Sequence, residues 1–361
     1  MNVRDIARKT VAAAAFLIWG CAAALAQGFA GLGGDAQGFA VPERGTALAF
    51  PRDHGPHPEF RIEWWYVTAV LKGEDGRDYG AQWTLFRSAA APRETEGWSS
   101  PQLWMGHAGL TTPDAHHSAE RLSRGGTGEA GATAQPFAAW IDEWRLAAPP
   151  GAASGDALDR LDMAAGGGDF RYDLTLEAKG PLVRHGDGGY SVKSQSGQAS
   201  YYYSQPFYEA SGTIEIGGRT VSVTGKAWLD REWSSQPLAA DQTGWDWFSL
   251  HFETGDRMMG FRLRQRDGGA FTSGTWIAPD GTPSPLGPDD LKLTPQGTAT
   301  VAGRTIPVVW RVQLPARGLD VTVRALNDAA WMDGRFPYWE GPVRVTGSLP
   351  GEGYLEMTGY E

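Results

Sequence analysis

The sequence predicts an all-β protein made of two tandem antiparallel β-barrels. Short β-branched and aromatic segments alternate with turns that use many of the 49 Gly and 23 Pro. The strongest helical pattern is the short segment His116–Ser123. One hairpin pattern, at Trp65–Arg87, recurs at Trp247–Arg264 and so appears in each half of the chain. Closing a sheet into a barrel removes its open edges, and this favours barrels over the alternative of two β-sandwiches.

The first 26 residues have the pattern of a secretory signal peptide. Arg4, Arg8 and Lys9 form a basic head, and an apolar run follows over residues 11–25. Small residues around Ala26 then provide a cleavage signal. We therefore expect export, with cleavage after Ala26 and a periplasmic location.

Cys21 is the single cysteine and lies inside this predicted signal. It allows two alternatives, a lipid anchor through Cys21 and an uncleaved membrane anchor. Bulky Trp19 makes a poor lipoprotein signal, so the cleaved peptide is preferred. The mature chain would then hold its fold by core packing without disulfides.

The remaining chain is longer than one hydrophobic core usually spans, so two domains are expected. Residues 27–58 are rich in Gly and Pro and are interpreted as an irregular leader. The N-terminal barrel is assigned to residues 59–236 and the C-terminal barrel to residues 237–361. In the repeat, Trp65 corresponds to Trp247.

Charge and motifs exclude several classes of function. The formal net charge is -10 and there is no basic patch, which argues against nucleic acid or an anionic membrane as partner. The sequence lacks a Walker loop, a dinucleotide fingerprint, a nucleophile elbow and a zincin motif. We expect no cofactor. The 16 Trp suit a wide apolar cavity as well as a core.

Strand alternation sorts the ionisable residues of Ala227–Pro237. Successive side chains of a strand point to opposite faces. Trp228 and Asp230 should therefore share one face, and Arg231 should lie on the other. Two further predicted strands add aromatic and ionisable groups that we expect on the same face as Asp230, namely Glu63 and Trp65 in one and Trp245, Trp247 and His251 in the other.

Each of these residues also has a structural explanation. Glu63 or Asp230 could simply pair with Arg231, Arg61 or Lys226 at a barrel rim. His107 and His251 could be hydrogen-bonded core residues. The pairs His54/His57 and His116/His117 lack further ligands at a usual spacing, so no metal site is expected.

Five motifs in order resemble the AttH/carotenoid 1,2-hydratase family. They extend from about residue 50 to the end of the chain and read "EFRIEWWYVTAVL", "HGDGGYSVKS" with "ASYYYSQP", "AWLDREWSSQ", "GWDWFSLHF" and "GYLEMTGY". The resemblance implies two lipocalin-like barrels in tandem. Members include secreted AttH-like proteins linked to ABC transporters and hydratases of apolar polyenes that need no cofactor.

Carried over residue by residue, the resemblance places Asp230 at the position of the hydratase acid. Its neighbours depart from the hydratase pattern, since Trp228 replaces a Tyr and Arg231 a His. By spacing, Tyr203 and Gln205 occupy the positions of an upstream His and Trp. These departures bring the chain nearer to the secreted AttH-like branch.

Three hypotheses follow. The leading one is a periplasmic protein that binds an apolar or amphipathic small molecule and serves an ABC transporter permease. The second is a hydro-lyase or isomerase acting on a lipid or polyene, with Asp230 as general acid, because an apolar surrounding keeps a carboxyl protonated. The third is a structural adaptor of a transporter. The candidate catalytic residues are Asp230 and Tyr203, and the candidate ligand-binding residues are Glu63, Trp65, His107, Gln205, Trp228, Trp245, Trp247 and His251.

Overall fold

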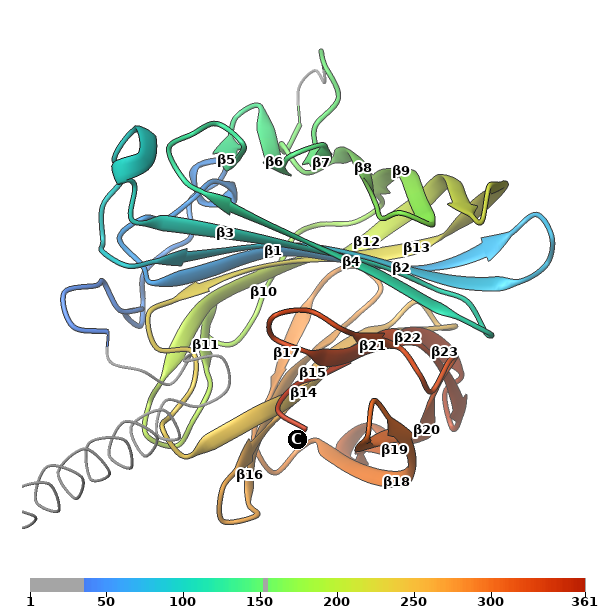
Figure 1. The fold of residues 1–361 in the computed structure, drawn as a ribbon. Helices are drawn as coiled ribbons and strands as arrows, with labels where there is room; N and C mark the ends of the chain where they lie inside the picture. Colours follow the sequence, from blue (N-terminus) through green and yellow to red (C-terminus); the bar gives the residue numbers. More distant parts are fainter. Residues whose placement is uncertain (1–35, 152–154, 361) are drawn as a thin grey trace, which may run out of the picture.

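The computed structural model describes residues 36–151 and 155–360, so the predicted signal peptide lies outside the described residues. Apart from short 3-10 turns such as Arg52–His54, the regular elements of this part are strands. None of its helices reaches the length and apolarity required to cross a membrane. The strands form two curled antiparallel sheets, a nearly closed barrel and a half-barrel, and so confirm the all-β, tandem-barrel prediction (Figure 1).

The first sheet contains 13 strands in the order β4-β3-β2-β1-β13-β12-β9-β8-β7-β6-β5, with β10 and β11 also paired to β12. Its strands are β1 Ile62–Gly73, β2 Asp78–Ala89, β3 Gln102–Thr111, β4 His116–Arg124, β5 Ala130–Ala134, β6 Phe137–Ile141, β7 Trp144–Ala147, β8 Arg160–Gly166, β9 Phe170–Ala178, β10 Val183–Arg184, β11 Tyr190–Val192, β12 Ala199–Ile216 and β13 Arg219–Ser234.

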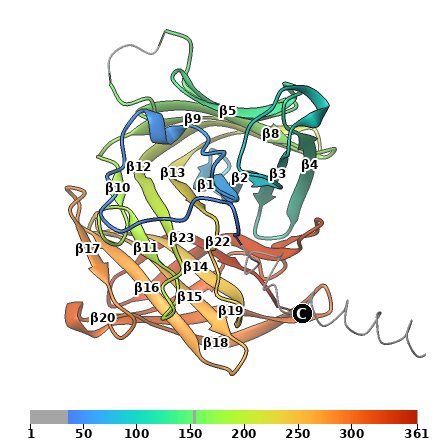
Figure 2. The same cartoon turned by 90° about the vertical axis from the view of Figure 1, so that its left-hand side faces the viewer.

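The second sheet contains 10 strands in the order β17-β16-β15-β14-β23-β22-β20-β19-β18, with β21 paired to β22. Its strands are β14 Gln242–Phe252, β15 Arg257–Gln265, β16 Ala270–Ile277, β17 Pro283–Leu286, β18 Lys292–Val301, β19 Arg304–Leu314, β20 Leu319–Ala325, β21 Trp331–Met332, β22 Tyr338–Gly347 and β23 Gly351–Met357. The chain passes from one sheet to the other between Ser234 and Gln242. Two views show the first sheet lying above the second (Figures 1 and 2).

The predicted hairpins are present as β1–β2 and β14–β15. The short helical pattern at His116–Ser123 does not form a helix, because these residues form most of strand β4. In this strand Leu122 pairs with Met105 and Arg124 with Leu103 of β3. Pairing of this segment with β3 at the edge of the sheet outweighs its weak local preference for a helix.

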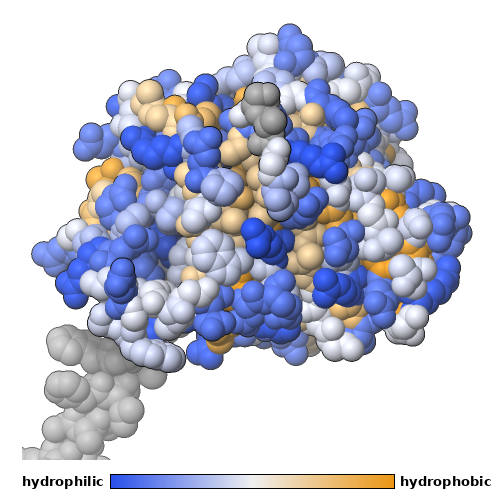
Figure 3. Space-filling model, turned by 90° about the horizontal axis from the view of Figure 1, so that it is seen from above, coloured by the Kyte–Doolittle hydropathy of each residue, from blue (hydrophilic) through white to orange (hydrophobic). Residues whose placement is uncertain are grey.

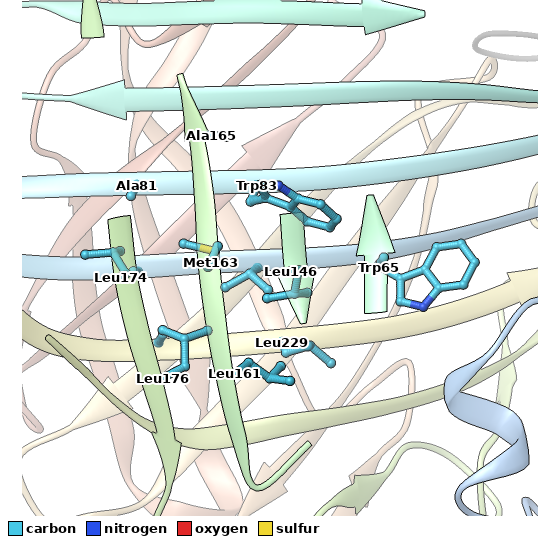
Figure 4. Close-up of a cluster of buried hydrophobic side chains, with 14 of the residues drawn as sticks. Trp65, Ala81, Trp83, Leu146, Leu161, Met163, Ala165, Leu174, Leu176 and Leu229 are labelled. Atoms are coloured by element: carbon cyan, nitrogen blue, oxygen red, sulfur yellow. The ribbon is translucent and has the colours of Figure 1, made fainter. Parts of the chain in front are cut away.

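The interior of the first barrel is filled with side chains (Figure 4). Trp65, Trp83, Leu146 and Leu229 are fully buried there against Met163 and its neighbours. Burial of each such side chain stabilises the fold by roughly 1.5–3 kcal/mol. The interior of the first barrel is therefore a packed hydrophobic core.

A separate apolar layer joins the two sheets. It includes Tyr66, Trp228, Trp247 and Phe261. The outer surface is different in character, and the face in Figure 3 carries mostly hydrophilic residues with apolar ones between them. The space available to a ligand must be sought in the joining layer.

Candidate functional site

A pocket of about 100 Å³ lies between the two sheets. Its walls are mainly aromatic and aliphatic, and three carboxyl groups and one ammonium group line it. The residues that form it come from both sheets and the connection between them, and they are Ile62, Trp64, Tyr66, Thr84, Phe86, Lys193, Tyr202, Asp230, Glu232, Pro237, Leu238, Trp245, Trp247, Phe261, Leu263 and Glu356.

Asp230 is the most enclosed acid of this pocket, with 2% of its surface exposed. Its carboxyl accepts hydrogen bonds from Tyr202 Oη at 2.7 Å, Trp228 Nε1 at 2.6 Å and Ser204 Oγ. Burial raises the pKa of Asp230 to about 7, even though these three donors favour the ionised form. Asp230 can therefore both hold and release a proton near neutral pH.

A buried polar chain continues from Asp230 into the second sheet. Ser204 contacts His185 Nε2 at 2.6 Å, and His185 Nδ1 lies 2.9 Å from Thr275 Oγ1. Burial, with Lys193 nearby, lowers the pKa of His185 to about 3. A neutral imidazole can donate through one nitrogen and accept through the other, so the chain can reverse its direction when Asp230 changes protonation.

Two further acids, Glu356 and Glu340, lie on the second sheet, and Glu356 shares the pocket with Asp230. Glu356 accepts a 2.5 Å hydrogen bond from Trp245 Nε1, and burial raises the pKa of Glu356 to about 7. Tyr66 donates a hydrogen bond to Glu340. Burial and the nearby Glu356 raise the pKa of Glu340 well above its usual value. Two carboxyl groups of the pocket, those of Asp230 and Glu356, thus have a pKa of about 7.

The one ammonium group of the pocket is held by another acid. Lys193 Nζ lies 2.8 Å from Glu232 and also sits over the rings of Tyr202 and Phe261, at 4.7 and 4.3 Å from their centroids. Glu232 compensates the charge of Lys193, and Asp230 is left without a cationic partner of its own among the described residues.

The aromatic candidates from the sequence surround Asp230. Trp247 Nε1 donates to Tyr202 Oη at 3.1 Å, and its ring meets that of Tyr66 edge to face at 5.3 Å. The ring of Trp228 packs edge to face on His251 at 5.7 Å. Burial lowers the pKa of His251 well below its usual value, so this residue is a neutral core histidine.

Tyr203, the second candidate catalytic residue, does not face Asp230. Tyr203 pairs in register with Arg231, and its hydroxyl lies 2.7 Å from His54 Nδ1 inside the first barrel. The residue that reaches Asp230 is its neighbour Tyr202. A shift of one residue in register moves every side chain to the opposite face.

Gln205 also lies away from the pocket. Its side chain donates to the Gly180 carbonyl oxygen at 2.9 Å and accepts from the Phe207 amide at 3.0 Å. These bonds hold the bulge of β12 between Gln205 and Tyr208. This geometry indicates a structural role for Gln205.

Glu63 and Trp65 lie on the barrel side of the first sheet, so the prediction of one common face fails for β1. Glu63 forms buried ion pairs with Arg87 and with Arg231, the latter at 3.1 Å. The guanidinium of Arg231 stacks 3.9 Å from the ring of Trp65. The structural explanation of Glu63, a carboxylate paired with arginine, is therefore correct. His57 also contacts Glu63, at 3.1 Å.

The repeat between Trp65 and Trp247 holds for the hairpins but not for these side chains. Trp65 faces the interior of the first barrel, and Trp247 faces the layer between the sheets. His107 occupies a third position, in a neighbouring groove, where it contacts Tyr338 at 3.0 Å and Glu120 at 3.2 Å.

Sequence reasoning missed several residues of the site. They are Tyr66, His185, Tyr202, Ser204, Thr275, Glu340 and Glu356. Alternation in "ASYYYSQP" separates Tyr202 and Ser204 from Tyr203, but only the pairing of Ser204 with Asp230 shows which set faces the acid. Among the described residues, no cluster of three or more His, Cys, Asp or Glu could hold a metal ion.

Comparison with known proteins identifies the family. Residues 41–360 match the AttH-like family. The chain belongs to the AttH-like family. A protein from Nitrosomonas europaea assigned to AttH, solved at 2.00 Å, is similar over 90% of this chain and 100% of its own, with 32% identity and a TM-score of 0.79.

A more distant structure shares the fold. Kievitone hydratase from Nectria haematococca matches with 16% identity and a TM-score of 0.64, over 89% of this chain and 98% of its own. No curated protein matches. The predicted resemblance and lipocalin-like architecture are confirmed.

Proposed function

We propose that this AttH-like protein is a hydro-lyase that adds water to, or removes it from, a carbon–carbon double bond of an apolar or amphipathic small molecule. One observation carries the proposal. Asp230 is a buried carboxyl with a pKa of about 7, and it lines an apolar pocket without a cationic partner among the described residues. Such a group is suited to general acid catalysis at neutral pH.

In the forward direction, the carboxyl proton of Asp230 is transferred to one alkene carbon, and the C=C π electrons form the new C–H bond. The neighbouring carbon becomes cationic, and the rings of Trp247 and Tyr66 stabilise it by roughly 0.5–2 kcal/mol each. A water oxygen forms the C–O bond and loses one proton. That proton returns to the Asp230 carboxylate or passes to Glu356, which has a similar pKa.

The residues around Asp230 keep it in position for this transfer. Tyr202, Trp228 and Ser204 hold its two oxygens, and Ser204 is in turn held by His185. The chain Ser204–His185–Thr275 can move a proton without leaving a charge on His185, whose pKa of about 3 disfavours the imidazolium. This arrangement keeps the Asp230 carboxyl hydrogen-bonded and oriented in either protonation state.

The test measures incorporation of ¹⁸O into candidate unsaturated lipids in H₂¹⁸O by mass spectrometry. We expect Asp230→Asn to lower incorporation by about 10²–10⁴-fold, the range for loss of a general acid. Asp162→Asn, at an exposed acid of β8, is the matched control and should keep full activity. Equal incorporation by wild type and Asp230→Asn would remove Asp230 as the catalyst.

The fold and family fit a ligand-binding protein as a second candidate. Its support is the mainly apolar wall of the pocket and of the groove beside it. Retained ligand binding and absent turnover in wild type would favour this candidate. The name of the distant neighbour, kievitone hydratase, supports the hydro-lyase.

Export to the periplasm, cleavage after Ala26 and service to an ABC transporter permease stay predictions from the sequence. N-terminal sequencing of the purified protein and fractionation of the cells check the first two. Co-purification of a permease with the native protein checks the third.

A further inference from the structure

A larger groove opens beside the Asp230 pocket. Its volume is about 580 Å³, within the range of roughly 300–1,000 Å³ typical of ligand sites, whereas the Asp230 pocket alone is smaller. The two spaces share four wall residues, Ile62, Phe86, Trp245 and Glu356. A ligand in the groove can therefore extend one end to Asp230.

Exposed large apolar side chains gather at the groove. Leu103, Leu122 and Phe336 are 52%, 49% and 37% exposed, and all three line the groove. In the described part of the chain only two other large apolar side chains are this exposed. Apolar side chains gathered at one hollow mark a binding surface.

Register gives the length of the groove. The pocket and the groove together cross the first sheet, from Asp230 on β13 in the pocket through β1, β2 and β3 to Arg124 on the edge strand β4 in the groove. Strands lie about 4.8 Å apart, so four steps between strands span roughly 19 Å. Asp230 is level in register with Glu120 of β4, four residues before Arg124, so the diagonal path from Asp230 to Arg124 is roughly 23 Å. This length fits an extended acyl or isoprenoid chain.

The groove is also positively charged. Arg61, Arg124 and Arg335 line it, and Glu356 is the one carboxylic residue of the lining. Arg61 Nε donates to the Ser235 carbonyl oxygen, which holds it at the wall. Arginine is well suited to binding carboxylate or phosphate oxygens.

Arg335 lies against the same edge strand as Arg124. The backbone amide of Arg335 donates to Glu120 Oε2 on β4 at 3.0 Å, and Glu120 also contacts His107. Glu120 therefore offsets part of the positive charge at this end. Arg124, which lies on β4 itself and pairs with Leu103 in register, adds a second guanidinium to this part of the groove.

We propose that the groove binds a long-chain amphipathic anion, with its carboxylate or phosphate head at Arg124 and Arg335 and its chain running across β3, β2 and β1 to Asp230. The placement of the reactive end at Asp230 rests on the proposed function. The binding of the anion itself does not.

The experiment measures dissociation constants by quenching of tryptophan fluorescence, using oleate and oleyl alcohol as probes. These share one chain and differ in charge. Wild type should bind oleate about 10-fold or more tightly than oleyl alcohol. The double variant Arg124→Gln/Arg335→Gln should lose this preference and keep its affinity for the alcohol. Arg324→Gln, at an exposed arginine of β20, is the control and should behave as wild type.

Equal affinity of wild type for both probes, or an oleate preference that survives in the double variant, would overturn the proposal. Leu122→Gln should weaken both probes and so reports the chain path separately from the head group. Wild type that sediments with phosphatidylglycerol vesicles but shows no quenching by oleate would place the arginines at a membrane surface and also overturn it.

Failure of the proposed function looks different. Oleate preference without ¹⁸O incorporation would leave the groove assignment standing and remove the hydro-lyase. Incorporation of ¹⁸O that depends on Asp230 but not on the charge of the head group would support the hydro-lyase and remove the groove assignment.

Discussion

Two buried clusters of ionisable side chains lie on opposite faces of the first sheet. Inside the barrel, Glu63 is held between Arg87 and Arg231. Between the sheets, Asp230 is held by a tyrosine, a serine and a tryptophan. Asp230 and Arg231 are consecutive residues, yet the pleat of β13 sends them into these two different surroundings.

The clusters shift their acids in opposite directions. Burial pushes the pKa of Glu63 up, but Arg87, Arg231 and His57 outweigh it and bring that pKa well below its usual value. Burial acts on Asp230 without a cation to oppose it, and its pKa rises to about 7. Partner type therefore separates a permanently ionised structural acid from one that can exchange a proton.

The largest expected effect comes from a substitution in the Glu63 cluster inside the barrel. Glu63→Gln leaves two guanidinium groups buried without their carboxylate, which costs about 3–5 kcal/mol of unfolding free energy. Urea denaturation at pH 6 measures it. Asp230→Asn is the matched control and should not destabilise the fold, because the amide has no proton to release on unfolding at this pH. A smaller loss for Glu63→Gln than for Asp230→Asn would contradict the comparison.

The next effect concerns pH. The folded protein keeps the Asp230 proton that the unfolded chain releases, so its stability falls as pH rises from about 4 to about 7 and then levels. Between pH 5 and pH 8 this loss is on the order of 2 kcal/mol.

Denaturation midpoints of wild type and Asp230→Asn across this range measure the difference. The variant should lose the part of the pH dependence of stability that comes from Asp230. The part that comes from Glu356, whose pKa is also about 7, should remain. Parallel curves for the two proteins would show that Asp230 is ionised throughout.

A smaller effect distinguishes adjacent tyrosines. The Tyr202 hydrogen bond lowers the pKa of Asp230, so Tyr202→Phe should raise that pKa. Tyr203→Phe removes a hydroxyl on the opposite face and should leave it unchanged. Carbon-13 NMR titration of the labelled Asp230 carboxyl reads the pKa in each variant. The same shift in both would contradict the assignment of faces.

The smallest effect tests the polar chain between the sheets. Thr275→Val removes the hydroxyl that contacts His185 at 2.9 Å, and we expect a loss of about 1 kcal/mol in denaturation. Thr272→Val, at a partly exposed position of the same strand, is the control and should cost less. Equal costs would mean that the His185 contact contributes nothing to stability.

The sequence by itself determined the local features of this protein. β-branched and aromatic runs with turn residues between them predicted the hairpins, and the period of two separated Asp230 from Arg231. These features depend on neighbours a few residues apart, which the sequence displays directly.

Only the tertiary structure decided which of the alternating faces meet. The pairing of Ser204 with Asp230 places Tyr202, and not Tyr203, beside the acid. The repeat had equated Trp65 with Trp247, but Trp65 lies in the core of the first barrel and Trp247 lies between the sheets. His185 and Glu356 reached the site from distant parts of the chain. Register and the stacking of two sheets depend on long-range packing, and no short pattern in the sequence encodes them.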